Sequence, residues 1–141
     1  MQLTDQQHEE LTELVKHYWN IAKREGLVPF DTEEPHIYTK QSGCAAGWAG
    51  YTHGALSVTF NEPMAASNWE RFQGTDNPDC TVGHEVAHCV NFIAHRGCRA
   101  HGKEWKMVMR LFGLDPNART HSYDMENVPH RRERRWQWKA A

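Results

Sequence analysis

The chain has 141 residues, with 16 lysines and arginines against 18 aspartates and glutamates and a formal net charge of −2. This length suits one domain with its own core, and no apolar run approaches the ~20 residues that a membrane span requires. The near-neutral charge excludes a basic field over the whole surface that would attract nucleic acid.

We expect a helix over residues 1–26. Thr4 followed by Gln7 resembles a capping box, and Gly26 is placed to end the helix. Between them an apolar stripe repeats at helical spacing: Leu11, Leu14, Val15, Tyr18 and Ala22. The polar start leads into this helix without a signal peptide, so we expect a cytoplasmic protein. We also expect a monomer that is not bound to membranes.

Residues 36–60 contain three short β-like runs, at 36–40, 45–51 and 55–60, separated by Ser42-Gly43 and His53-Gly54. They predict a small antiparallel three-stranded meander, and a short helix follows to about Phe72. The small residues at 45–50 either let a substrate backbone approach closely or allow tight packing between sheet and helix. The sequence leaves both readings open.

Residues 80–113 hold the pattern H-E-x-x-H as His84, Glu85 and His88. In a helix over 82–95 the two histidines lie one turn apart on the same face, where both imidazoles can reach one metal ion. Glu85 is then placed to polarise a metal-bound water. Zinc fits this pattern best, because it accepts nitrogen ligands and a catalytic site keeps one position open.

A catalytic zinc site needs a third protein ligand. His95 lies about 10 Å along the helix axis from His88, since seven residues make about two turns, and this is too far for both to bind one ion. A turn at Gly97 would return the chain to His101, which opens a second amphipathic stretch ending near residue 113. We therefore predict His101 as the third ligand and keep Glu104, one turn later, as the alternative.

These motifs resemble the SprT family of zinc metalloproteases, which includes the Spartan DNA–protein crosslink proteases. The resemblance lies in H-E-x-x-H, twelve intervening residues and then H-G-K-E-W at 101–105, and it extends to R-T-H at 119–121 and the arginine-rich end. It implies a single α+β domain over residues 1–141 with a zincin-like, minigluzincin-type fold. It also implies a zinc-dependent endopeptidase holding one Zn²⁺ and acting on protein or peptide substrates.

Residues 119–141 are predicted to form basic C-terminal strands that end in a β-hairpin, with a strand at 120–125. His121 or Tyr123 would either donate a hydrogen bond to the reacting oxygen or play a packing role, and the packing role is favoured. The last residues combine cations with aromatic rings, as Arg131, Arg132, Arg134, Arg135, Trp136 and Trp138. Such residues can bind phosphates and stack on bases, or form a solvated hairpin with arginines over tryptophan faces.

The resemblance favours the nucleic-acid reading, with single-stranded DNA or DNA-bound proteins as partners. A protein of this kind would associate with the nucleoid, or act in the host cytoplasm if it is of phage origin. Members of the family usually continue into a zinc ribbon, and the present sequence stops where its first cysteine pair is expected. This departure weakens the expectation of DNA dependence more than that of peptidase chemistry.

The sequence thus predicts a peptidase that cleaves DNA-associated or DNA-crosslinked proteins. Glu85 would take a proton from a zinc-bound water, whose pKa falls towards ~7, and pass it to the leaving amine. The alternative is a nucleic-acid- or protein-binding module with a structural zinc and vestigial peptidase activity. The presence of Glu85 argues against that alternative, because a structural site needs no base.

Overall fold

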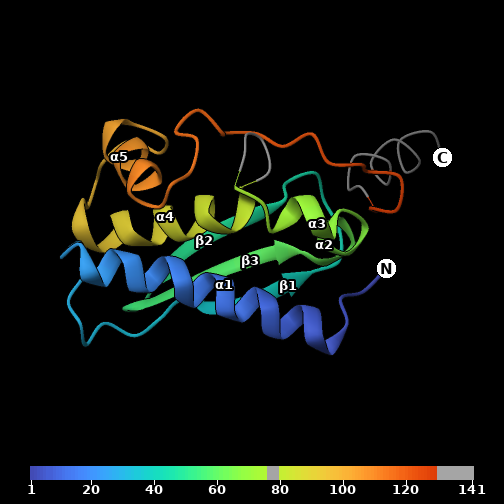
Figure 1. The fold of residues 1–141 in the computed structure, drawn as a ribbon, viewed down its shortest axis with the longest axis horizontal. Coiled ribbons are helices and arrows are strands. Elements are labelled where there is room, and N and C mark those ends of the chain that lie inside the picture. Colours follow the sequence, from blue (N-terminus) through green and yellow to red (C-terminus); the bar gives the residue numbers. More distant parts are fainter. Residues whose placement is uncertain (76–79, 130–141) are drawn as a thin grey trace.

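The computed structural model describes residues 1–75 and 80–129. Along this part of the chain the elements follow one another as α1 (Asp5–Arg24), β1 (His36–Lys40), β2 (Gly47–Thr52), β3 (Ala55–Asn61), α2 (Glu62–Ser67), α3 (Trp69–Phe72), α4 (Thr81–Ala94) and α5 (Lys103–Leu111). Together they form the small α+β domain that the sequence predicts (Figure 1).

The N-terminal helix α1 confirms the predicted capping box. The Thr4 side chain accepts a hydrogen bond from the Gln7 backbone N–H at 3.1 Å, and the Gln7 side chain accepts one from the Thr4 N–H at 2.9 Å. Just past the helix, Gly26 has a φ of +73°, in the left-handed region that glycine tolerates. The buried stripe consists of Leu11, Val15, Tyr18, Trp19 and Ala22.

The three-stranded sheet has the order β1-β3-β2. Strands β2 and β3 form the expected antiparallel hairpin, but β1 pairs with β3 in parallel, so the predicted antiparallel meander is wrong at β1. The link between β1 and β2 crosses the end of β3, where Asn61 holds it. The Asn61 Nδ2 donates to the carbonyl oxygens of Gly43 (3.2 Å) and Ala45 (3.4 Å). The Asn61 backbone N–H donates to the carbonyl oxygen of Ala46 (2.9 Å).

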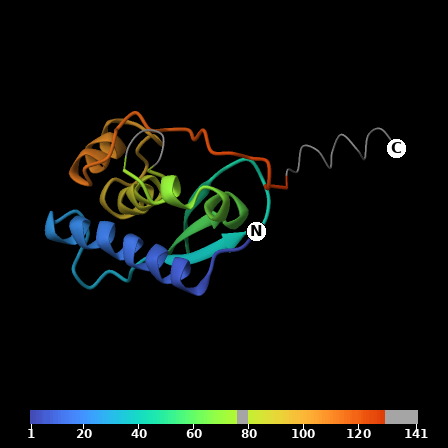
Figure 2. The ribbon, with the colours of Figure 1, turned by 45° about the vertical axis from the view of Figure 1, so that its right-hand side comes forward.

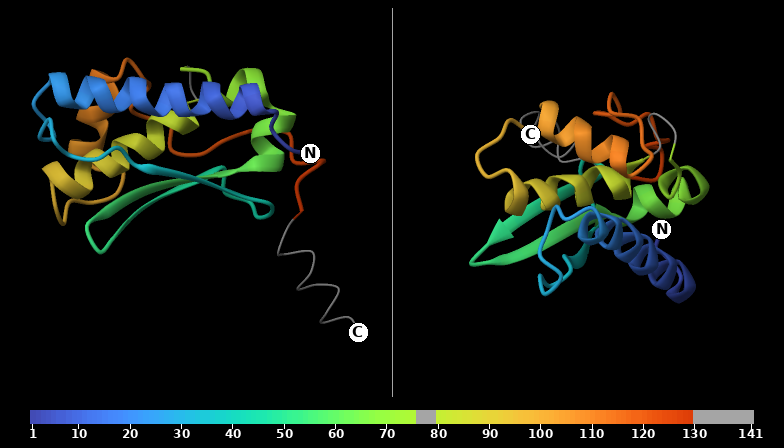
Figure 3. Two further views of the ribbon diagram at one scale, coloured as in Figure 1. Left: turned by 90° about the horizontal axis from the view of Figure 1, so that it is seen from below. Right: turned by 60° about the vertical axis from the view of Figure 1, so that its left-hand side comes forward.

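Helices α1 and α4 lie on the same side of this sheet (Figure 3). Leu56, Val58 and Phe60 of β3 are buried beneath them, as their alternation predicts. Strand β2 forms one edge of the sheet, and α4 packs against it. Helix α5 packs on α4 and completes the predicted returning pair (Figure 1).

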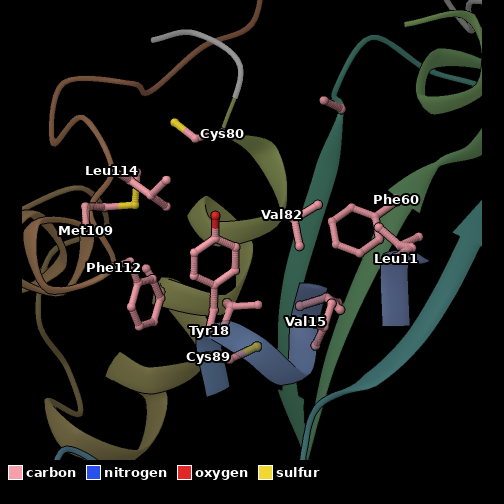
Figure 4. Packing of buried hydrophobic residues seen from close by; sticks show 14 of the residues in the cluster. Leu11, Val15, Tyr18, Phe60, Cys80, Val82, Cys89, Met109, Phe112 and Leu114 are labelled. Carbon is pink, nitrogen blue, oxygen red and sulfur yellow. The ribbon is translucent and has the colours of Figure 1, made fainter. Parts of the chain in front are cut away.

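The core fixes α4 tightly against its neighbours. Tyr18 of α1 packs beside Phe112, with ring centroids 5.1 Å apart, and Leu114 approaches α4 from the same side (Figure 4). A Cβ added at Gly83 would overlap Leu114 Cδ1 and come within 3.2 Å of the Tyr18 ring. The absence of a side chain at Gly83 therefore allows close packing next to His84.

After α5 the chain runs back past α4 towards α2 and α3 (Figure 2). Residues 119–129 contain no strand, so the predicted strand at 120–125 is wrong. The reason is that this segment bonds to side chains instead of to a neighbouring strand. Asn68 Nδ2 donates to the Asp124 carbonyl at 3.0 Å, and Arg71 donates to the Ser122 carbonyl at 3.3 Å.

The predicted C-terminal hairpin, with all of its arginines and tryptophans, lies outside the described residues. None of the helices in the described chain is both long enough and apolar enough to span a bilayer.

Candidate metal centre

Three histidines converge at the middle of α4. His84 and His88 lie one helical turn apart on α4, and His101 returns from the turn before α5 with a left-handed φ of 59°. The Nε2 atoms lie 3.2 Å apart between His84 and His88, 3.1 Å between His88 and His101, and 3.0 Å between His84 and His101. The predicted third histidine thus joins the pair.

This triangle fits a zinc ion. Tetrahedral zinc with Zn–N bonds of about 2.0–2.1 Å holds its nitrogen ligands about 3.3 Å apart, close to the distances observed. Among the described residues no other histidine, cysteine, aspartate or glutamate joins this cluster. Glu104, the alternative ligand, stays outside it, and His95 instead places its Nδ1 2.8 Å from Asn91 Oδ1.

The surrounding chain prepares His84 as a ligand. Its Nδ1 lies 2.9 Å from the carbonyl oxygen of Ala118, which can only accept, so Nδ1 carries the proton and Nε2 presents a lone pair. Burial lowers the pKa of His84 to about 4, although the hydrogen bond to Ala118 by itself raises that pKa. Burial also lowers the pKa of His88 to about 3, assisted by the two neighbouring histidines. Neutral imidazoles are the form that binds a metal.

Trp105 forms the wall behind the three imidazoles and explains the tryptophan of H-G-K-E-W. Its fully buried ring lies between 4.7 and 5.6 Å, centroid to centroid, from the rings of His84, His88 and His101. Its Nε1–H donates to the carbonyl oxygen of His84 at 3.3 Å. The first turn of α5 therefore supports the ligands of α4.

Glu85 lies beside the triad, with Oε1 3.9 Å from His84 Nε2. The residue is only 5% exposed, and burial raises the pKa of its carboxyl to about 8 in the metal-free chain. Gly47 of β2 closes the other side, because a Cβ there would come within 2.9 Å of Glu85 Cγ. The small residue at position 47 thus leaves room for the carboxylate, in agreement with the tight packing between sheet and helix that was one of the two readings of residues 45–50.

Two cavities flank the triad along α4. One, of about 420 Å³, lies towards the start of α4 and is lined by Ala46, Thr81 and Ala118 among others. The other, of about 590 Å³, lies towards the end of α4, beside Phe92 and Arg99. Four residues line both: Gly47, His84, Glu85 and Arg119. The metal site therefore sits at the centre of an elongated cleft beside the edge strand β2.

His121 and Tyr123 are held by contacts within the protein. His121 lies at the cavity near the start of α4, where Nε2 donates to the Cys44 carbonyl at 2.7 Å and Nδ1 accepts from the Tyr123 N–H at 3.2 Å. The Tyr123 hydroxyl lies 2.8 Å from Thr81 Oγ1. Both residues tie the segment after α5 to the walls of the cleft.

The fold and the histidine triad define a zincin-like domain with a site for a metal ion. The SprT-like family model matches residues 11–124, and the chain belongs to this family. The match confirms the resemblance read from H-E-x-x-H and H-G-K-E-W. No solved structure matches the chain significantly.

Several relatives carry the name Protein SprT. The one from Pectobacterium carotovorum is 30% identical over 98 residues, covering 70% of this chain and 54% of that protein. The one from Pseudomonas fluorescens is 34% identical over 123 residues, covering 84% and 67%. The one from Pseudomonas putida is 38% identical over 97 residues, covering 65% and 52%. The chain thus spans from about half to two thirds of the length of these relatives.

Proposed function

We propose that this protein is a zinc-dependent endopeptidase that acts on DNA-associated or DNA-crosslinked proteins. One observation carries the proposal: three imidazole Nε2 atoms lie 3.0–3.2 Å from one another with the carboxylate of Glu85 beside them. His84, His88 and His101 would hold one Zn²⁺.

When bound there, zinc supplies a Lewis acid that polarises a carbonyl and acidifies a coordinated water. Glu85 acts as the general base: its carboxylate takes a proton from the attacking water and later delivers it to the leaving amine nitrogen. A carboxyl group in so apolar a place is a stronger base than one in water, which suits this task near neutral pH. The Ala118 carbonyl keeps His84 in the ligand tautomer throughout.

Strand β2 is the proposed docking edge for the substrate. Of the two edge strands, β2 borders the cleft, and Gly47 and Ala49 line its wall beside the histidines. An extended peptide can add to such an edge through main-chain hydrogen bonds, which places a scissile bond against the triad.

The choice of DNA-associated targets rests on the resemblance and on the charge pattern. Acidic residues outnumber basic ones in the first third of the sequence, and arginines crowd the last third. A protein with this distribution can approach a polyanion through one end only. The basic residues at 131–135 are the proposed contact.

The described chain disfavours a purely structural zinc. Structural zinc sites usually have four protein ligands, whereas only three candidate ligand residues cluster within residues 1–75 and 80–129. The cleft also opens directly at the triad, as a site for catalysis requires. A structural ion would need neither the open position nor the neighbouring carboxylate.

The decisive experiment measures cleavage of casein by the zinc-loaded protein, with and without single-stranded DNA, beside the Glu85→Gln variant. We expect wild-type cleavage that a chelator blocks, and stimulation by DNA. Glu85→Gln should keep its zinc, measured by atomic emission, while its kcat falls by about 10²–10⁴, the usual contribution of a general base. Equal rates for both proteins would refute the role of Glu85, and no cleavage by fully zinc-loaded wild type would favour the binding module.

A further inference from the structure

Arg119 is an exposed residue that lines the cleft beside the triad. It immediately follows Ala118, whose carbonyl oxygen lies 2.9 Å from His84 Nδ1, so the main chain at this point flanks one histidine of the triad. Of the described residues, four line both cavities: Arg119, Gly47, His84 and Glu85. The other arginine of the cleft, Arg99, lines one cavity alone.

Arg119 borders the cleft on both sides of the triad. It lines the cavity towards the end of α4 together with His88 and His101, and the cavity towards the start of α4 together with His84 and Glu85. The residue therefore brings a cation to the place where the two cavities meet, beside the three imidazoles.

Nothing in the described chain neutralises this cation. Within residues 1–75 and 80–129 the Arg119 guanidinium makes no ion pair and no hydrogen bond, and only its backbone N–H is engaged, with the Asn117 carbonyl at 2.9 Å. A free cation beside a site for a divalent metal ion weakens metal binding by repulsion. Such an arrangement becomes favourable when a negative charge arrives or develops between the two.

In peptide hydrolysis that negative charge develops on the carbonyl oxygen. The water oxygen bonds to the carbonyl carbon, the C=O electron pair moves onto the carbonyl oxygen, and Glu85 takes the proton of the water. The pair then reforms the C=O bond, the C–N bond breaks, and the proton passes to the amine. The guanidinium stays protonated throughout and carries N–H groups suited to an oxyanion.

We propose that Arg119 is a catalytic residue that donates hydrogen bonds to the scissile carbonyl oxygen as its negative charge develops. This inference rests on the proposed peptidase function and adds a residue to its machinery. The sequence suggested His121 and Tyr123 for this task, but both already make hydrogen bonds within the protein. The ring nitrogens of His121 bond to the Cys44 carbonyl and the Tyr123 N–H, and the Tyr123 hydroxyl bonds to Thr81. Arg119 is two residues away from His121 and has its donors available.

The test compares Arg119→Ala and Arg119→Lys with wild type, using Arg110→Ala, an exposed arginine in the last turn of α5, as the matched control. Five quantities are measured: kcat and KM on a neutral peptide, zinc affinity by chelator competition, affinity for a phosphinic peptide by calorimetry, and thermal stability. The phosphinic group imitates the charged tetrahedral state, so its binding reports on Arg119 without turnover.

We expect Arg119→Ala to lower kcat by about 10²–10³, the usual effect of losing an oxyanion donor. Phosphinic-peptide affinity should fall in parallel, while KM and stability change little. Zinc affinity should be equal or tighter, because a repelling charge is gone. Arg119→Lys should restore part of kcat, since it keeps the charge and loses the planar fork. Arg110→Ala should match wild type.

Three results would overturn the proposal. Weaker zinc binding in Arg119→Ala would make the residue a support of the metal site. A raised KM with unchanged kcat would make it a group for ground-state binding. Loss confined to peptides with acidic side chains would make it a specificity determinant. If wild type itself cleaves nothing, the proposed peptidase function fails. The binding measurement tests Arg119 separately: if Arg119→Ala binds the phosphinic peptide as tightly as wild type does, the oxyanion role is rejected.

Discussion

Gly47 shows how a single missing side chain can decide the position of a catalytic group. A Cβ at this position would lie 2.9 Å from Glu85 Cγ and 3.1 Å from Oε2, closer than unbonded atoms tolerate. We expect Gly47→Ala to displace the carboxylate and to reduce kcat by about 10–10², since a displacement of about 1 Å can cost that much. Zinc content should not change.

Gly50→Ala is the control for this substitution, because it lies in the same strand and its Cβ would meet only the Ser57 hydroxyl, at 2.9 Å. Steady-state cleavage of one peptide by both variants makes the comparison. A Gly47→Ala protein with wild-type kcat would contradict the placement of Glu85 against β2.

Trp105 supports the metal ligands through both its ring and its N–H. Trp105→Phe keeps an aromatic ring and loses the hydrogen bond to the His84 carbonyl. Trp105→Ala also opens a cavity behind three imidazoles. We expect Trp105→Ala to weaken zinc binding about 10–100-fold and to destabilise the metal-free protein by about 3–5 kcal/mol. Trp105→Phe should lose less zinc affinity and less stability than Trp105→Ala.

Chelator competition and urea unfolding of the metal-free protein measure these two effects. The stability loss follows from buried volume alone, whereas the loss of zinc affinity requires contact with the ligands. Unchanged zinc affinity in Trp105→Ala would show that the histidines hold their positions without this wall.

At the scale of elements, Glu62 at the start of α2 joins the N-terminal segment to the end of β1. Its carboxylate accepts from the Leu3 N–H (3.0 Å) and Gln41 Nε2 (2.7 Å) and lies 3.3 Å from His8 Nε2. Burial by itself raises the pKa of Glu62, but these hydrogen bonds and the nearby His8 outweigh it and lower the pKa below its ordinary value of 4.5.

Because the folded carboxyl binds a proton less readily than the unfolded one, Glu62 stabilises the fold above pH 4.5 and loses this contribution as the pH falls through the lowered folded pKa. We expect Glu62→Gln to reduce the free energy of unfolding by about 1–3 kcal/mol at pH 7. The difference from wild type should shrink below pH 4.5. Urea titrations at several pH values test this, with Glu9→Gln on the exposed side of α1 as control.

Local patterns predicted the elements whose contacts are local. The capping box of α1, the alternation in β3 and the helical spacing of His84 and His88 all depend on neighbours a few residues away. The direction of β1 depends on Asn61, more than twenty residues further along the chain, and periodicity does not record it. The segment at 120–125 looked like a strand and instead bonds to side chains around α3.

The same distinction holds for the candidate site. Spacing identified the three histidines and Glu85, because two lie on one helix and the third follows a glycine turn. Gly47 and Arg119 approach the triad from segments far apart in the sequence. Gly47 stands in the run of small residues at 45–50 and Arg119 in R-T-H at 119–121, but neither pattern indicates a position beside the histidines. The roles expected for residues 131–138 stay predictions.

At the scale of the molecule, four separate segments of the described chain assemble the cleft: β2 with the link before it, α4, the turn at 97–101 and residues 118–121. The segment at 118–121 is fastened to the others by the His84–Ala118 and His121–Cys44 hydrogen bonds. Beyond it, the Pro129 carbonyl accepts from the Gly43 N–H at 2.8 Å, in the link before β2. Pro129 therefore lies beside the link that leads into β2, the strand proposed to hold the substrate.

We predict that DNA binding and peptide cleavage can be separated by mutation. Replacing Arg131, Arg132, Arg134 and Arg135 by alanine changes none of the described residues that line the cleft, so we expect cleavage of a free peptide without DNA to keep its wild-type rate. Affinity for single-stranded DNA should fall and depend less on salt. If each arginine contacts one phosphate, the slope of log K against log salt concentration should decrease by about 3, from ~0.7 per phosphate.

Replacing Trp136 and Trp138 by alanine provides the matched comparison. Stacking depends little on ionic strength, so this variant should lose about 1–3 kcal/mol of binding free energy per stacked base with an unchanged salt slope. Fluorescence anisotropy of labelled single-stranded DNA at several salt concentrations distinguishes the two patterns. An unchanged slope in the arginine variant would exclude these side chains as phosphate contacts, while retained DNA stimulation of cleavage would place the activating surface elsewhere on the protein.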